Sequence, residues 1–537
     1  MSTSHHDVLI AGGGLAGLTL ALQLKDEMPE LDVRVVERRA HPAPVAAHKI
    51  GESSVEIGAH YFAETLGLRA HLDDKHLRKF GFRFFFSEGE RDLSGVTELG
   101  ASRHLTTPAW QIDRGIFENF LAEEALRRGV RVDDSTSVKH IALGKTDEHR
   151  IEVERAGSRE TVSARWLIDA SGRAGLLKRK LDLAEDNAHD ANAVWFRLDT
   201  RLVIDDWVAD PAWRARCTPA ARWLSTNHLC GPGYWLWLIP LGSGAHSVGI
   251  VAHAAMHPLA TMNTFDKAMD WISTHQPCVY EVLDRSRDTL MDFAFFRNFS
   301  YGCKQVFSHD RWALTGDAGW FLDPFYSPGS DFIAIGNTYI TALIRADRAG
   351  EAIRVPALFY GEVFRSFYDN TLALYTNQYA LFGNARVMPQ KVLWDYAYYW
   401  GVLCQFFFQK RLTDRAALAD LREPLMRAQL LNQRMQALLR AWGEATTNEV
   451  VHAASSHQNA MIDQANLPWF AELNRGLCDR LDEEQFRSRV RFNVAQMETL
   501  AEEIVGMALH DAPALVASIP PGLAPSAANS LLFGKAA

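Results

Sequence analysis

The alternation of apolar and polar positions at the start of the chain predicts a strand, a turn and a helix. Residues 7–11 (DVLIA) form a short apolar run of the kind found in a buried parallel strand. They lead into 12–17 (GGGLAG), after which residues 18–28 (LTLALQLKDEM) continue with helical spacing. A second apolar run, 33–36 (VRVV), ends in Glu37. We therefore expect a strand–glycine turn–helix–strand unit in this segment.

The glycine turn carries the residues expected of a dinucleotide site. Glycines allow a tight turn and a close backbone approach, and the helix N-terminus supplies N–H groups and a positive dipole end for a pyrophosphate. An acidic side chain about 20 residues further on can accept hydrogen bonds from a ribose. A lone glycine motif is weak evidence, but here strand, glycines, helix, strand and acid follow in order. The predicted contacts are Gly12, Gly14, Ala16, Gly17 and Glu37.

Two later strands favour FAD over NAD. Residues 166–169 (WLID) run into a turn of small residues, and 312–314 (WAL) lead to Gly316–Asp317–Ala318. We expect these strand ends to meet the first one at the carboxyl edge of a single sheet, where open α/β sheets bind their ligands. Asp317 would then hydrogen-bond the ribityl chain, and the helix after Gly329 would direct its N-terminus at the flavin. The pattern resembles the FAD-binding fold of the aromatic hydroxylases, and Arg114, at the start of a helix in 111–117 (QIDRGIF), fits that class.

The predicted fold class is α/β (α+β). A Rossmann-like, discontinuous FAD-binding domain would occupy 1–345, with a mixed β-sheet substrate domain inserted around 185–295. A helical C-terminal region is expected over 355–519, and a loosely ordered tail over 520–537. Residues 421–442 and 483–507 have amphipathic helical spacing typical of surface helices. The aromatic run 394–408 suits either a buried helix packed on the FAD domain or a wall of the substrate cavity.

Composition and charge exclude several classes of protein. The 537 residues are 47% hydrophobic and 23% charged, as in ordinary globular proteins, and the net charge of -9 argues against nucleic acid as a partner. No apolar window of about 18 residues predicts a transmembrane helix. The six cysteines are scattered, which favours reduced, buried thiols in a cytoplasmic protein. His253 and His257 stand four apart without an acidic or cysteine neighbour, so no metal site is predicted.

Three motifs together resemble the flavin-dependent halogenases. They are the glycine turn, the WxWxIP of residues 235–240, and Phe321-x-x-Pro324-x-x-Ser327-x-Gly329. Alternating bulky residues also suit an ordinary half-buried strand, but two tryptophans followed by Ile-Pro are uncommon. Residues 49–54 (KIGESS) resemble the Gly-Glu turn that the family carries beside the flavin. Residues 77–84 (LRKFGFRF) resemble the strand that bears its catalytic lysine, which assigns that role to Lys79.

The resemblance implies a reaction and a set of contacts. FADH2 from a separate flavin reductase would react with O2 to a C4a-hydroperoxide, and bound chloride or bromide would be oxidised to hypohalous acid. The acid would pass through a tunnel to Lys79, which directs it at an electron-rich aromatic carbon. Glu52 would lie at the flavin as a second catalytic residue, the alternative being a structural acid of the turn. The implied cofactor contacts include Asp317, Pro324 and Gly329, the halide contacts are Ser327, Pro328 and Gly329, and the tunnel wall comprises Trp235, Trp237, Ile239, Pro240 and Phe321.

Two positions depart from the family pattern. Relatives that act on free tryptophan carry a glutamate where this chain has Tyr326, so a phenol, a pyrrole or a carrier-bound aryl group is the expected substrate. The family holds halide by the N–H groups of the two residues after the serine, and Pro328 has none. A lost donor to a buried anion costs about 1.5–3 kcal/mol. Two alternatives therefore stay open: a related monooxygenase or oxidoreductase that does not use halide, and a non-catalytic FAD-containing partner of a biosynthetic complex.

Overall fold

The glycine-rich segment folds as its pattern predicts. In the computed structural model, strand β1 (Ser4–Ala11) enters the turn, helix α1 (Leu15–Glu27) leaves it, and β2 (Val33–Val36) follows. The structure describes residues 4–44, 50–145, 147–446, 461–519, 521–523 and 531. Most of the expected tail 520–537 and Lys49 of the 49–54 segment therefore lie outside the described residues.

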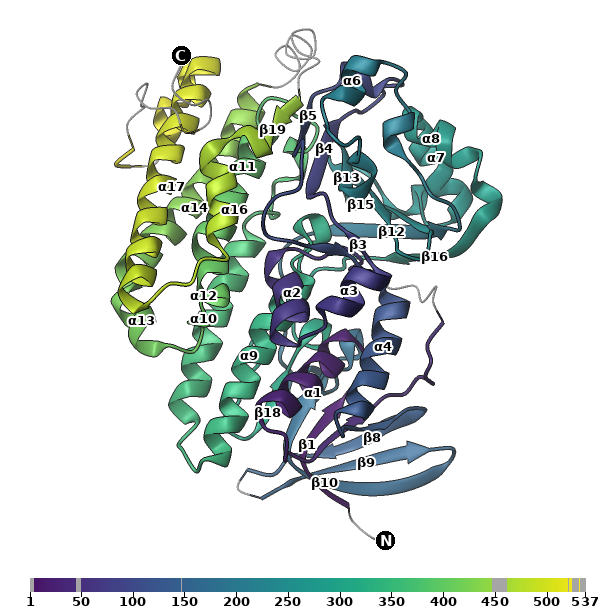
Figure 1. Cartoon of the computed structure of the whole chain (residues 1–537), viewed down its shortest axis with the longest axis vertical. Helices are drawn as coiled ribbons and strands as arrows, with labels where there is room; N and C mark the ends of the chain where they lie inside the picture. Colours follow the sequence, from purple (N-terminus) through teal and green to yellow (C-terminus); the bar gives the residue numbers. More distant parts are fainter. Residues whose placement is uncertain are drawn as a thin grey trace. The chain divides into compact units, whose positions relative to one another are not determined.

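The chain divides into two units, and Figure 1 labels the helices and strands along the chain. The first unit comprises Met1–His76, Ile112–Asn187 and Ser300–Asp369. The second comprises Leu77–Gln111, Ala188–Phe299 and Asn370–Ala537. Among the described residues, no helix combines the length and the apolar character needed to span a membrane.

A mixed sheet forms the centre of the first unit. Its strand order is β7-β2-β1-β10-β9-β8, and β18 pairs with β10. Strands β7, β2, β1, β10 and β18 run parallel, and β9 is antiparallel to both of its neighbours, β10 and β8. Because Ala11, Asp169 and Leu314 share one register line, the three strand ends expected to meet do so. Its remaining strands are β7 (Arg131–Asp133), β8 (Thr136–Ala142), β9 (His149–Arg155), β10 (Ser158–Asp169) and β18 (Trp312–Leu314).

Helices cover this sheet, and α1 packs against α4 and α9. A strand such as β2 needs this cover because all four of its residues are buried, on both faces of the sheet. The first-unit helices are α2 (Glu56–His60), α3 (Arg69–Lys75), α4 (Arg114–Arg127), α5 (Leu176–Lys180) and α9 (Gly329–Arg348), and α10 (Arg354–Leu372) follows. A small sheet pairs β11 (Ala184–Glu185) with β17 (Gly302–Cys303).

The second unit is built on another mixed sheet, which we call the second-unit sheet. Its order is β16-β12-β15-β14-β13-β4-β5-β19. The strands are β4 (Phe82–Phe86), β5 (Glu98–Gly100), β12 (Ala191–Leu198), β13 (Thr226–Gly231), β14 (Tyr234–Pro240), β15 (His246–His253), β16 (Leu290–Phe296) and β19 (Met461–Asp463). Beside it, β3 (Leu77–Arg78) pairs with β6 (Trp110–Gln111).

One face of this sheet packs on short helices. Leu236, Leu238 and Ile250 belong to a buried cluster that includes Trp271 of α7 (Phe265–His275) and Val279 of α8 (Pro277–Asp284). The same unit also contains α6 (Pro211–Ala215). This apolar face explains the alternation of residues along β14 and β15.

The C-terminal part is helical, as expected. The predicted amphipathic helices are confirmed as α14 (Arg422–Ala445) and α17 (Glu483–Asp511), which pack together. The aromatic run forms α11 (Met388–Tyr398), a π-helical turn and α12 (Cys404–Phe408), and nearly all of it is buried. Helices α13 (Arg415–Asp420) and α16 (Pro468–Gly476) complete the described part. All six cysteines are free and five are buried, but Cys478 is exposed, contrary to the expectation of buried thiols throughout.

Candidate active site

The glycine turn leaves room on one side only. Gly12 has φ +124°, and a Cβ there would lie 2.2 Å from the Ala170 carbonyl oxygen. A Cβ on Gly17 would lie 2.0 Å from the Gly12 oxygen, so both glycines are required by packing within the fold. Gly14 is different, because a Cβ there meets nothing within 4 Å. Gly14 caps α1, so this open side lies at the helix N-terminus, where a pyrophosphate fits.

The carboxylate of Glu37 shapes the same turn. Its Oε2 accepts a hydrogen bond from the Gly13 N–H at 2.7 Å, and its Oε1 accepts one from the Arg39 N–H at 2.8 Å. The side chain is only half-buried and stands at the end of β2 beside the turn. A carboxylate so placed can still accept from a ribose hydroxyl, and the contact with Gly13 is an additional role that spacing alone does not reveal.

Asp317 lies where β18 meets the glycine turn. Gly316 has φ +59°, and a Cβ there would lie 2.8 Å from the Cβ of Ala16, so both small residues allow the close approach. The Tyr301 hydroxyl donates to the Asp317 carbonyl oxygen at 2.7 Å. Burial raises the pKa of the Asp317 carboxyl, and the charges of Arg173, Arg114 and Lys178 oppose that rise.

Two cations near Asp317 were not singled out from the sequence. The Lys178 ammonium donates to the Gly319 carbonyl at 2.8 Å and lies 3.9 Å from the Tyr301 ring centroid. Burial lowers the pKa of Lys178. The Arg173 guanidinium lies 5.0 Å from the centroid of Tyr301 and 5.1 Å from that of Phe321. Arg173 in the turn after β10 and Lys178 on α5 are basic residues within ten positions of the end of β10, and this spacing was the signal that could have identified them. Together they surround the carboxylate expected to hold the ribityl chain with positive charge.

Arg114 fixes the turn that contains Glu52. The Arg114 Nη1 donates to the Ile50 carbonyl at 2.9 Å, and a Cβ on Gly51 would lie 2.9 Å from that nitrogen. The Arg114 Nε donates to Glu118 at 3.0 Å within α4. The Glu52 carbonyl accepts from the Ile112 N–H at 2.6 Å, and the residue is 2% exposed. Arg114 thus orients the Gly-Glu turn, and Glu52 is a buried acid rather than a surface one.

The Phe321–Gly329 segment ends in a reversal that starts α9. Pro324–Tyr326 form one 3₁₀ turn, Ser327 has φ +51°, and Pro328 caps α9. The Asp331 and Phe332 N–H groups both donate to the Pro328 carbonyl at 3.1 Å. The N–H groups of the first two helical residues, Gly329 and Ser330, have no acceptor within the helix. The two N–H donors at this corner are therefore those of Gly329 and Ser330, one residue later than the two positions after Ser327 that the family pattern gives.

The start of α9 is held firmly in the first unit. Asp331 accepts from the Gly58 N–H at 2.8 Å, and a Cβ on Gly58 would lie 2.2 Å from the Ser330 Oγ. Further along, the buried Asn337 accepts from Thr315 at 2.7 Å and donates to the Ala16 carbonyl at 3.2 Å. Asn337 thus ties α9 to both β18 and α1. A Cβ on Gly329 would meet nothing within 4 Å, so the first residue of α9 has open space beside it.

Lys79 lies in the second unit, in the link between β3 and β4. The resemblance placed it within a strand, but residues 79–81 interrupt the strand, and Gly81 has φ +86°. Lys79 is only 5% exposed, which excludes a solvated lysine at a strand edge. Its N–H donates to the Ala109 carbonyl at 2.8 Å, and its ammonium lies 3.4 Å from the centroid of the Phe82 ring. The charge is held by an aromatic face in a buried position.

An aromatic face of the second-unit sheet continues from Phe82. Phe84 pairs with His228, and His228 pairs with Trp237, so the three side chains project to the same side. Trp235 shares that side because it stands two residues from Trp237. The ring centroids lie 4.7 Å apart for Phe84 and His228, 5.1 Å for His228 and Trp235, and 5.6 Å for Trp235 and Trp237.

Residues from the C-terminal helices contact this face. The Trp235 Nε1 donates to the Tyr379 hydroxyl at 3.1 Å, and the Tyr396 ring of α11 lies 6.2 Å from the Phe82 ring. The Trp237 Nε1 donates to Ser247 at 3.1 Å. Ile239 and Pro240 are buried at the end of β14. The predicted wall residues Trp235, Trp237, Ile239 and Pro240 therefore share the unit of Lys79, whereas Phe321 belongs to the first unit.

The described residues contain no group of three or more histidine, cysteine or acidic side chains arranged to hold a metal ion. His257 instead places its Nε2 2.9 Å from the Pro232 carbonyl.

Comparison with known proteins agrees with this geometry. An FAD binding domain family matches residues 5–221. The flavin-dependent halogenase chlA of Dictyostelium discoideum is 26% identical over 440 residues, covering 76% of this chain and 71% of that protein. A 1H-pyrrole-2-carbonyl-[peptidyl-carrier protein] chlorinase of Pseudomonas fluorescens is 23% identical over 406 residues, covering 71% and 85%.

A solved structure shares the fold over most of its length. Halogenase PltM in complex with phloroglucinol and FAD aligns with a TM-score of 0.62 at 15% identity, covering 92% of this chain and 96% of that one. The glycine turn with its open side at Gly14, Asp317 at the adjoining strand end and the sequence matches lead to one assignment. The chain is an FAD-dependent oxidoreductase, and it is similar over most of its length to flavin-dependent halogenases.

Proposed function

We propose that this protein halogenates an electron-rich aromatic substrate with hypohalous acid directed by Lys79. The observation that carries the proposal is the buried Lys79 ammonium, 3.4 Å from the Phe82 ring in the unit that also bears Trp235 and Trp237. The Lys79 ammonium can donate a hydrogen bond to neutral hypohalous acid, and the aromatic rings beside it can contact an aryl substrate. Reduced FAD, when bound, supplies with O2 the oxidising equivalents that convert halide to hypohalous acid.

Lys79 acts on the oxygen of the hypohalous acid. Its ammonium hydrogen-bonds that oxygen, which makes the halogen more electrophilic. The aryl carbon attacks the halogen, the halogen–oxygen bond breaks, and the oxygen leaves as water with the proton from Lys79. The arenium carbon then loses its proton, and Lys79 regains one, so aryl–H and hypohalous acid give aryl halide and water. The buried rings of Trp235 and Trp237 exclude water from the aromatic face of the second-unit sheet that continues from Phe82.

The halide in this proposal lies at the start of α9. The N–H groups of Gly329 and Ser330 and the positive end of a 20-residue helix favour an anion there. This arrangement offsets the donor that Pro328 lacks. Glu52 is 2% exposed in the turn that Arg114 holds through the Ile50 carbonyl, and in this proposal it lies at the flavin.

Two features support the substrate class. Tyr326 removes the carboxylate that an amino-acid substrate would need for its ammonium, which favours a phenol or a pyrrole, free or bound to a carrier protein. The Pseudomonas relative is named for a carrier-bound pyrrole, and the PltM structure contains the phenol phloroglucinol. A separate flavin reductase supplies FADH2, and the free cysteines support a reducing, cytoplasmic setting.

A halide-dependent product assay tests this function. The FAD-loaded protein is incubated with a flavin reductase, NADH, O2, bromide and phloroglucinol, or with a pyrrolyl carrier protein, and the products are identified by mass spectrometry. We expect brominated product that requires bromide. A hydroxylated product formed with or without halide would instead support the second candidate, a monooxygenase, which the missing N–H of Pro328 favours.

A further inference from the structure

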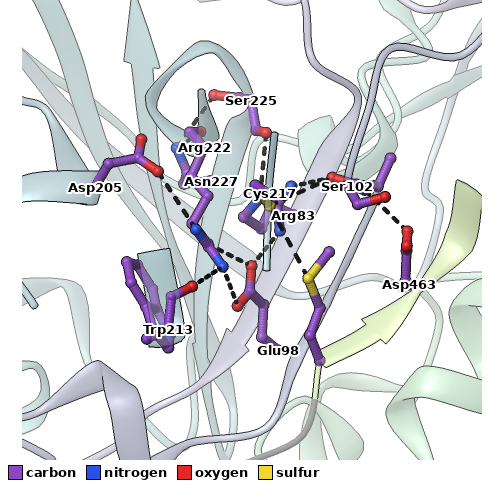
Figure 2. A network of polar contacts seen from close by, with 12 residues as sticks. Arg83, Glu98, Ser102, Asp205, Trp213, Cys217, Arg222, Ser225, Asn227 and Asp463 are labelled. Atoms are coloured by element: carbon purple, nitrogen blue, oxygen red, sulfur yellow. Dashed lines mark hydrogen bonds and ion pairs between the residues drawn. The ribbon is translucent and has the colours of Figure 1, made fainter. Parts of the chain in front are cut away.

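Two buried arginines of the second unit share one glutamate (Figure 2). Arg83 stands on β4, Glu98 on β5, and Arg222 on a 3₁₀ turn, Arg222–Leu224. All three side chains are 0% exposed. Arg83 Nη1 pairs with Glu98 Oε1, and Arg222 Nε donates to the same oxygen at 2.8 Å. Buried charges are tolerated only when paired and hydrogen-bonded, so this geometry is tightly specified.

The remaining donors of Arg222 are also engaged. Its Nη2 donates to the Trp213 carbonyl at 2.9 Å, and its Cζ lies 3.8 Å from the Trp213 ring centroid. Its Nη1 lies 3.5 Å from Asp205, whose other oxygen accepts from the Trp223 N–H at 3.0 Å. Asp205 therefore holds both the side chain of Arg222 and the backbone of the next residue. The turn cannot shift without disrupting several buried contacts at once.

Arg83 is fixed in the same way from the strand side. Its Nη2 donates to the Ala101 carbonyl, and its Nε lies 3.4 Å from the Ser225 Oγ. A Cβ on Gly100 would lie 2.7 Å from the Arg83 Nη1, so glycine at position 100 makes room for the guanidinium. Both sides of the network thus converge on residues 222–226.

The turn at 222–226 holds the backbone on the C-terminal side of Lys79. The Phe80 N–H donates to the Leu224 carbonyl at 3.1 Å, and the Thr226 N–H donates to the Gly81 carbonyl at 3.1 Å. On the other side, the Lys79 N–H donates to Ala109. Residues 79–81 are not part of a strand, and Gly81 is free to adopt many backbone conformations. These hydrogen bonds therefore hold the backbone of the link in place of a strand ladder.

We propose that Arg222, together with Glu98, Asp205 and Arg83, is a positioning device for Lys79. This inference rests on the proposed function, because the network would hold the Lys79 ammonium at the position from which it directs hypohalous acid at the substrate. Lysine has a long flexible side chain, and a misplacement of 1 Å at a reacting group can cost on the order of 100-fold. A loosened Arg222 turn would therefore release hypohalous acid without halogenating the substrate, while flavin reoxidation continues.

The test compares two buried arginines of the second unit. Arg222→Lys keeps the charge but loses the forked guanidinium, and Asp205→Asn keeps the shape of the partner. The matched control is Arg197→Lys: Arg197 is also buried and lies 3.8 Å from Asp292, but on β12, which β15, β14 and β13 separate from β4. Each full-length, FAD-loaded protein is assayed with flavin reductase, NADH, O2, bromide and phloroglucinol. The readouts are brominated product per flavin reoxidised and hypobromous acid captured by an added diketone.

Arg222→Lys is expected to lower product per flavin reoxidised on the order of 10-fold and to raise diketone bromination correspondingly. Asp205→Asn should act in the same direction to a smaller extent, and it serves if Arg222→Lys does not fold. Arg197→Lys should keep the wild-type ratio even where its melting temperature falls equally. Equal ratios in all three variants would show a purely structural network and overturn the proposal.

Lys79→Ala, assayed in parallel, separates this proposal from the function on which it rests. If Lys79→Ala keeps the wild-type product yield, the directing role of Lys79 is wrong, and the positioning role falls with it. If Lys79→Ala abolishes product while the Arg222 and Asp205 variants behave like Arg197→Lys, only the positioning proposal is wrong.

Discussion

Replacing Gly14 by alanine separates cofactor binding from folding. Gly14 has φ −89° and ψ −170°, which alanine adopts freely, and the added methyl group meets no protein atom within 4 Å. The cost to the apoprotein is limited to the weaker capping of α1, at most about 1 kcal/mol. The methyl group does occupy the side of the turn where the pyrophosphate must approach the backbone. We therefore expect FAD to bind at least 10-fold more weakly, about 1.4 kcal/mol.

Gly17 provides the contrasting variant. A methyl group there would lie 2.0 Å from the Gly12 carbonyl oxygen, so Gly17→Ala forces the strand and helix apart and costs about 1–3 kcal/mol or more. Thermal unfolding of the apoproteins should show little change for Gly14→Ala and a clear loss for Gly17→Ala. FAD titration followed by flavin fluorescence gives the affinities. Wild-type affinity in Gly14→Ala would refute the placement of the cofactor at this turn.

Two further predictions concern buried charge in the second unit. Lys391 and Asp395 form an ion pair 2.6 Å apart, with side chains 0% and 2% exposed. Asp395→Ala leaves a buried unpaired charge and should lower the free energy of unfolding by about 3–5 kcal/mol, as measured by urea denaturation. The double variant Lys391→Met with Asp395→Leu should be close to neutral. An equal loss in the single and double variants would contradict this reasoning. Burial lowers the pKa of His246 to about 3, so the unfolded state binds the proton more tightly and stability falls as the pH drops from 6.5 towards 3. His246→Gln should remove about 2 kcal/mol of the loss between pH 6.5 and pH 5, and an unchanged pH slope would show that His246 does not cause it.

The local parts of the site were predictable from the sequence. The turn from β1 to α1, the acid after β2 and the paired tryptophans of β14 each depend on neighbours within a few residues, so spacing reveals them. The meeting of β1, β10 and β18 also followed, because parallel strands share a carboxyl edge. Ser330 was not predicted as a halide contact. Which backbone N–H groups lack an acceptor within α9 depends on the residue at which the helix begins, and the motif alone does not fix that residue.

The environment of Lys79 could not be predicted in the same way. Its backbone is fixed by Leu224 and Ala109, and its ammonium by Phe82, and these contacts depend on the pairing of β4 with the distant β13. No local pattern specifies such long-range pairing or the sharing of Glu98 by Arg83 and Arg222. The break in the strand at 79–81 is visible in the sequence only as Gly81, which alone is a weak signal.

The most direct test of the central claim is the product of Lys79→Ala in the bromide assay, with Lys267→Ala, an exposed lysine of the same unit, as the control. In an excess of the diketone, which traps free hypobromous acid before it reacts with phloroglucinol in solution, Lys79→Ala should reoxidise flavin and brominate the diketone while forming no brominated aromatic product, and Lys267→Ala should match the wild type. A wild-type yield of brominated product from Lys79→Ala would contradict the account.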